Sequence, residues 1–314
     1  MRSSSRLFPV SLMAAELTGK FSEDIYQLNP GTSKDSSVRL TVTRITDPDW
    51  RQSRRPVILL HGEFRNRRDF ISPDGRGLAA QLAESGFDVW IPEMRGHGLT
   101  PPNDRMAANR LLYYAREDWP QVHRFVMEQV GGQPPIWVAP SLGAQSLACG
   151  LIHVPKMLHD TAGVVFVDPG SEQKLWLWQD LKTVERWRVM RKNFIDGLPR
   201  QWGPEREPVM LLREQRHWQM AARQGQHPVF DHLRRINVPS LTIAHRNAEE
   251  VARRFHGKLG GREKAFLALP DRSSRSENPG DAAAWPPDIR HAIEHWLIEG
   301  NVEEVKVSPE QLTG

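Results

Sequence analysis

Ser141 has the surroundings of a nucleophile. It follows the apolar run 136–140 and precedes Leu142, where a helical pattern begins. A tight turn between a strand and a helix lifts a serine Oγ clear of the sheet, and the helix N-terminus supplies N–H groups and partial positive charge. Such a serine can attack an acyl carbonyl and form an acyl-enzyme. The motif is an imperfect G-x-S-x-G, because Ala139 replaces the first glycine. A serine that only caps the helix is the alternative interpretation.

Short apolar runs and helical patterns alternate along the chain. We predict strands at 24–28, 38–45, 56–60, 87–92, 136–139, 163–167, 240–244 and 265–269, and helices at 77–85, 119–130, 142–152 and 287–299. This alternation predicts an α/β protein with a mostly parallel central sheet and helices on both faces.

Three further motifs accompany the serine turn, in a fixed order along the chain. They are Leu60-His61-Gly62 at the end of a buried strand, the segment 86–98 with Arg95-Gly96-His97-Gly98, and Asp118-Trp119-Pro120 before the next helix. Together with the turn at Ser141 they resemble the α/β-hydrolase superfamily, especially its esterase and lipase-like branch. The resemblance covers roughly residues 56–297.

The resemblance implies roles for several residues. Ser141 becomes the nucleophile, and the backbone N–H groups of Leu142 and Glu63 form the oxyanion hole, which stabilises the tetrahedral intermediate. His61 is expected to brace its turn. The carboxylate of Glu63 is unfavourable beside a developing negative charge, unless it points away or pairs with Arg65, Arg67 or Arg68.

The catalytic acid and base depart from the superfamily pattern. Asn247 stands where the acid is expected, and the loop 270–278, where the histidine is expected, contains no histidine. The triad therefore looks degenerate. Asp168, after the strand 163–167, is an alternative acid, although an aspartate before Pro-Gly can simply form a turn. His245 is a non-standard candidate for the base.

The region 171–231 interrupts the alternation of strands and helices. It holds five of the eleven tryptophans, and we expect a helical cap over the active site. Three cap-side histidines, His217, His227 and His232, are further candidates for the base, each with a surface or packing role as the alternative. The predicted organisation is a flexible N-terminus at 1–20, a hydrolase core at 21–170 and 232–300, the cap at 171–231, and a flexible tail at 301–314.

Composition limits the remaining possibilities. The 314 residues are 39% hydrophobic and carry a net charge of +4, with no nucleic-acid motif. The one cysteine, Cys149, forms no intrachain disulfide, and no apolar run approaches the ~18 residues that span a bilayer. We therefore expect a cytoplasmic protein without a transmembrane segment. His291 and His295 are spaced like metal ligands but fall on the polar face of the last helix, so neither a metal nor a cofactor is expected.

These observations favour a serine hydrolase that acts on a small-molecule acyl or aromatic ester through an acyl-enzyme at Ser141. The alternative is a catalytically inactive member of the fold that binds a hydrophobic ligand or a protein partner. The missing histidine favours the second interpretation, and the intact serine turn and its accompanying motifs favour the first.

Overall fold

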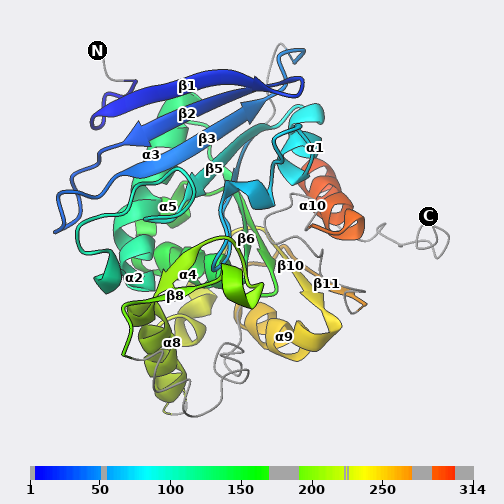
Figure 1. Ribbon diagram of the computed structural model, residues 1–314. Helices are drawn as coiled ribbons and strands as arrows, with labels where there is room; N and C mark the ends of the chain where they lie inside the picture. The colour runs from blue at the N-terminus through cyan, green and yellow to red at the C-terminus, as the bar shows by residue number, and fades with distance from the viewer. Residues whose placement is uncertain are drawn as a thin grey trace.

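The central element of the protein is one large twisted sheet. The computed structural model describes residues 4–50, 55–169, 191–222, 224, 226–270 and 285–300. The nine strands lie in the order β1-β2-β3-β5-β4-β6-β7-β10-β11 (Figure 1). Their bounds are β1 Val10–Thr18, β2 Phe21–Leu28, β3 Leu40–Thr46, β4 Pro56–Leu59, β5 Asp88–Glu93, β6 Ile136–Pro140, β7 Gly163–Val167, β10 Ser240–His245 and β11 Lys264–Leu269.

Helices cover both faces of this sheet. They are α1 Leu78–Glu84, α2 Leu111–Tyr113, α3 Trp119–Gln129, α4 Ser141–His153, α5 Pro155–His159, α8 Val209–Ala222, α9 Glu249–Lys258 and α10 Pro287–Glu299. One apolar core lies between the sheet and α3, α4, α5 and α9, and a second lies between the sheet and α1 and α10. Figure 1 shows α1 and α10 side by side. The sheet is parallel from β5 to β11, as the alternation of strands and helices predicts, and antiparallel from β1 to β5.

The register of three neighbouring strands brings the candidate site residues together. Pro140 of β6 lies opposite Val167 of β7, and Val167 lies opposite Ile243 of β10. The residues that follow, Ser141 and Asp168, therefore leave the sheet at the same edge as His245, the last residue of β10. Catalytic groups of open α/β sheets gather at this carboxyl edge.

The N-terminus differs from the prediction of a flexible segment at 1–20. Residues 10–18 form β1, which pairs antiparallel with β2 at the edge of the sheet. Leu12, Met13 and Leu17 are exposed, so the strand buries little apolar surface. The prediction was wrong because backbone pairing, not a hydrophobic face, holds this edge strand in place.

The described part of the cap is not wholly helical. It begins with a short hairpin of β8 (Phe194–Asp196) and β9 (Arg206–Pro208), followed by α8. The first part of the predicted cap, with Trp176, Trp178 and Trp187, lies outside the described residues. So do most of the loop 270–278 and the predicted tail 301–314.

Arg95 and Asp118, which belong to two of the sequence motifs, form a buried ion pair. Arg95 donates to both carboxylate oxygens of Asp118, at 2.8 and 2.6 Å, and also bonds to Glu117 at 2.8 Å. The side chains of Arg95 and Asp118 are each 2% exposed. The pair joins the loop after β5 to the π-helical turn η3 (Tyr114–Asp118) that leads into α3.

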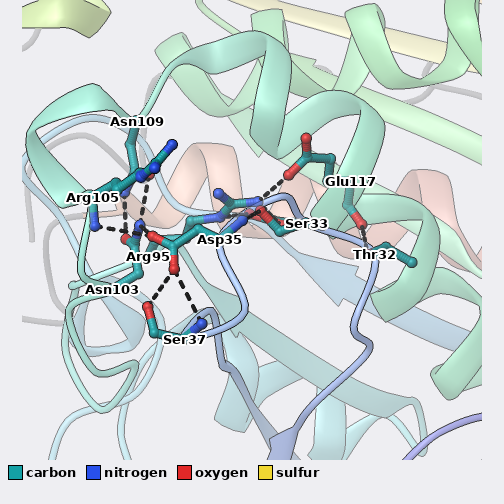
Figure 2. A network of polar contacts seen from close by, with 10 residues as sticks. Thr32, Ser33, Asp35, Ser37, Arg95, Asn103, Arg105, Asn109 and Glu117 are labelled. Carbon is teal, nitrogen blue, oxygen red and sulfur yellow. Dashed lines mark hydrogen bonds and ion pairs between the residues drawn. The ribbon is translucent and has the colours of Figure 1, made fainter.

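A second polar network fixes the loop between β2 and β3 (Figure 2). Asp35 accepts hydrogen bonds from Ser37, from Asn103 Nδ2 at 2.8 Å and from the Arg105 N–H at 2.9 Å. These bonds, with the one from Ser37 foremost, hold the pKa of Asp35 well below its usual range. The bonds from Ser37 stay within the loop after β2, and those from Asn103 and Arg105 join it to the loop after β5, so the network fixes both loops.

Candidate active site

Ser141 occupies a strained turn between β6 and α4. Its φ is +44°, a left-handed conformation that costs a non-glycine residue roughly 1–2 kcal/mol. Such strain persists where the surrounding structure imposes it, often at functional sites. Gly143 shows the close packing here, because a Cβ at this position would lie 2.5 Å from the carbonyl oxygen of His61. Ala139 is fully buried in β6, so the methyl group in the first glycine position of the motif fits the sheet.

Asp168 and His245 form a close pair beside this turn. The Asp168 Oδ2 atom lies 2.6 Å from His245 Nδ1, and Oδ1 accepts the His245 backbone N–H at 2.9 Å. Asp168 also has a positive φ of 44°. A carboxylate on Nδ1 selects the tautomer with its proton on that nitrogen and leaves Nε2 as the basic nitrogen. An aspartate bonded to Nδ1 is also how the acid and the base are arranged in a Ser-His-Asp triad.

Ser141 itself contacts Glu63. Its Oγ donates to Glu63 Oε1 at 3.0 Å, and the backbone N–H of Leu142 donates to Glu63 Oε2 at 3.1 Å. Within the described residues, Ser141 has no hydrogen bond to a histidine. β7 separates β6 from β10, so the backbones of Ser141 and His245 are two strand spacings, or about 10 Å, apart.

Within the described residues, the other candidates for base and acid form no hydrogen bond with Ser141, Asp168 or His245. His217 and His232 are exposed. His227 is buried, and its Nδ1 accepts the backbone N–H groups of Val229 and Phe230 at 3.1 and 3.0 Å. Asn247 is exposed in the 3-10 turn that follows β10. Of the two predicted orienting residues, Asp168 is therefore the one bonded to the His245 ring.

His61 braces the turn after β4, as expected. Its Nδ1 donates to the carbonyl of Gly62 at 2.8 Å, and its Nε2 accepts the N–H of Met94 at 3.0 Å. Burial, assisted by the neighbouring His97, lowers the pKa of His61 to about 3. The ring is therefore neutral at physiological pH, and both of its nitrogens serve the backbone.

The three arginines after Glu63 are bound to other groups. Arg65 pairs with Asp69 at 3.4 Å, Arg67 with Glu23 at 2.7 Å, and Arg68 donates to the carbonyl of Ile71 at 3.4 Å. The carboxylate of Glu63 points into the site, onto Ser141 and Leu142. The carboxylate therefore does not point away, which was one of the two conditions under which it would not oppose a developing negative charge. A side-chain rotamer cannot be predicted from the sequence. The two donors at the N-terminus of α4, Ser141 Oγ and the Leu142 N–H, attract a carboxylate, and this attraction explains the orientation of Glu63.

Two carboxylates of the cap bind the loop after β4, which contains Glu63, and the loop after β5. Glu207 Oε1 accepts the N–H of Phe64 at 2.9 Å, and Glu205 Oε1 accepts from Asn66 Nδ2 and from the N–H of Gly98. Glu207 also lies 3.6 Å from the buried His97, and it raises the pKa of that histidine although burial opposes the charge. The sequence offered no signal for these residues, because Glu205-Arg206-Glu207 resembles a charged surface loop.

The described residues contain neither a metal site nor a membrane span. Groups of three or more His, Cys, Asp or Glu that could hold a metal ion do not occur among them. None of their helices is long and apolar enough to cross a membrane.

Comparison with known proteins identifies the family. The family model for the alpha/beta hydrolase fold matches residues 55–229, more than half of the chain, so the chain belongs to this family. No curated protein sequence matches it. A putative lipase from Sulfolobus solfataricus has a similar structure, with a TM-score of 0.59 and 12% identity, over 93% of this chain and 99% of that one.

Two other solved structures resemble the chain to a similar degree. A thermophilic esterase from Thermogutta terrifontis has a TM-score of 0.55 and 16% identity, over 85% of this chain and 96% of that one. A monoacylglycerol lipase from Paleococcus ferrophilus has a TM-score of 0.53 and 17% identity, over 83% of this chain and 99% of that one. At these identities the likeness establishes the fold alone.

Proposed function

We propose that this protein is a serine hydrolase that cleaves carboxylic esters, with Ser141 as nucleophile, His245 as general base and Asp168 as the residue that orients His245. The observation that carries the proposal is the Asp168–His245 pair, 2.6 Å between Oδ2 and Nδ1, at the sheet edge where Ser141 occupies its strained turn. If Asp168 only formed a turn, or if His245 only packed in the core, the two hydrogen bonds between them would not be needed.

The proposed reaction follows from these positions. Ser141 Oγ attacks the ester carbonyl while its proton passes to His245 Nε2, and the carbonyl electron pair moves onto oxygen. The intermediate then collapses, the bond to the alcohol oxygen breaks, and that oxygen takes the proton from His245. Water repeats the sequence on the acyl-enzyme and releases the acid, which regenerates Ser141. The N–H of Leu142 is the proposed donor to the oxyanion.

We propose a small-molecule acyl or aromatic ester as the substrate. Phe64, which follows Glu63 directly, is fully buried, and its ring lies 5.3 Å from that of the buried Trp202, so these rings pack the cap against the oxyanion turn. The fold neighbours described as esterases and lipases are compatible with such a substrate.

Labelling with a fluorophosphonate probe tests the proposal directly. We expect stoichiometric labelling of the wild type, measured by intact mass, and none of Ser141→Ala. Ser36→Ala is the control, because Ser36 is an exposed serine in the loop after β2, and it should label like the wild type. Labelled protein should then be mapped by peptide mass to residue 141.

Absence of labelling in a folded wild type would overturn the proposal. The alternative is then a non-catalytic member of the fold that binds a hydrophobic ligand or a partner. The bond from Ser141 to Glu63 favours that alternative, because it directs the hydroxyl proton away from any histidine.

A further inference from the structure

Glu63 places a carboxylate on the two groups that an ester substrate would need. Its oxygens lie 3.0 Å from Ser141 Oγ and 3.1 Å from the Leu142 nitrogen. The first atom is the proposed nucleophile and the second is the proposed donor to the oxyanion. We propose that the Glu63 carboxylate is an internal occupant of the oxyanion hole, which substrate must displace before Ser141 can be acylated. This inference rests on the proposed function of Ser141.

The charge of Glu63 explains both why it binds there and why it must leave. α4 is 13 residues long, and the positive end of its dipole attracts an anion. Charge-assisted hydrogen bonds are stronger than those that a neutral ester carbonyl can form with the same donors. Once the tetrahedral intermediate develops its negative charge, however, a carboxylate in the same hole would repel it.

Because the backbone next to Glu63 is anchored, we infer that the carboxylate leaves the oxyanion hole by rotation of the side chain. Phe64 has a φ of +58°, donates its N–H to Glu207, and accepts the N–H of Glu205 at 3.1 Å. Gly203 of the cap packs so closely that a Cβ there would overlap the Phe64 carbonyl. The side chain of Glu63 is half-buried, so it can rotate toward solvent while the backbone stays in place.

Two other roles for Glu63 make different predictions. As a cap of α4, Glu63 would stabilise the helix without affecting the reactivity of Ser141. As the general base, it would have to keep its bond to Oγ while the Leu142 N–H turned to the substrate. The structure argues against a base, because the same carboxylate holds both donors, whereas His245 has a supporting acid of its own.

The experiment compares Glu63→Gln with the wild type, because glutamine keeps the shape and removes the charge. We expect the second-order rate constant for labelling by a neutral fluorophosphonate to rise about tenfold or more. Glu16→Gln, on the exposed face of β1, is the matched control and should leave the rate constant unchanged. A lower rate constant in Glu63→Gln would show that Glu63 assists the reaction, and an unchanged one would show that it leaves without cost. Either result would overturn the inference.

A binding measurement separates this inference from the proposed function. The backbone amide of Leu142, observed by NMR, reports the contents of the hole without any reaction. We expect butyrate to shift this resonance in Glu63→Gln at concentrations that leave the wild type unchanged. If no form of the protein labels with fluorophosphonate, the proposed function fails and the butyrate titration still decides whether Glu63 fills the hole. Equal binding of butyrate to both proteins would overturn the inference.

Discussion

Asp168 holds His245 through both of its oxygens, so its replacement should affect reactivity more than folding. Asp168→Asn fits the left-handed backbone, because asparagine tolerates positive φ better than most residues. The amide no longer stabilises an imidazolium and can select the wrong tautomer. We therefore expect the rate constant for fluorophosphonate labelling to fall roughly 10²- to 10⁴-fold. Thermal unfolding followed by circular dichroism should show that the variant remains folded.

A second aspartate–histidine pair provides the control for this prediction. Asp160 lies 2.8 Å from the exposed His159, and it precedes β7, whereas Asp168 follows that strand at its opposite end. Asp160→Asn should leave the labelling rate constant unchanged. If Asn247→Ala slows labelling while Asp168→Asn does not, the orienting residue is Asn247 and our assignment is wrong.

At the scale of elements, the Arg95–Asp118 pair joins two segments that the sequence shows only as separate motifs. Arg95→Met would leave Asp118 buried without its cation. We expect this to lower the free energy of unfolding by about 3–5 kcal/mol, measured by urea denaturation. The double variant Arg95→Met/Asp118→Leu should lose less, since no uncompensated charge remains.

An exposed ion pair tests whether burial causes the loss of stability that we expect for Arg95→Met. Arg76 and Asp74 lie 2.6 Å apart, but their side chains are 80% and 54% exposed. Arg76→Met should therefore change stability little. An equal loss of stability in Arg76→Met and Arg95→Met would contradict the argument.

The accuracy of the sequence prediction also depends on the kind of element. The buried parallel strands and the helices α1, α3, α4 and α10 were found nearly at their observed bounds, because burial imposes a readable periodicity. β1 was missed because hydrogen bonding, rather than an apolar face, holds it. The cap hairpin β8–β9 was missed because each strand has only three residues.

The site was predictable only in part, for a related reason. The turn at Ser141 and the position of Asp168 follow from where strands end, which the apolar runs show. The pairing of Asp168 with His245 requires the order of the strands, because β7 and β10 are neighbours although about 70 residues separate them. The orientation of Glu63 depends on its side-chain rotamer and on the cap. Neither can be predicted from a local sequence pattern.

At the scale of the whole molecule, buried titratable groups have opposing effects on how stability depends on pH. Burial lowers the pKa of His61 to about 3 and those of His123 and His227 to about 4, so the folded protein keeps these rings neutral. Burial raises the pKa of Asp118 to about 6, although Arg95 opposes the shift. The histidines destabilise the fold as the pH falls, and Asp118 acts in the opposite direction. A single variant is therefore needed to isolate one contribution.

His227 offers the cleanest such variant. His227→Asn places an oxygen near the position of Nδ1, where it can still accept the N–H groups of Val229 and Phe230, but it does not titrate. Below pH 6.5 the unfolded wild type binds a proton at this histidine, and the folded form does not until about pH 4. The free energy of unfolding of the wild type, relative to His227→Asn, should therefore fall by up to about 2 kcal/mol between pH 6.5 and pH 5. Urea denaturation of both proteins at the two pH values measures this difference. A difference that stays constant would mean that His227 binds its proton equally in the folded and unfolded states, and that burial of this ring has no effect on the acid stability of the protein.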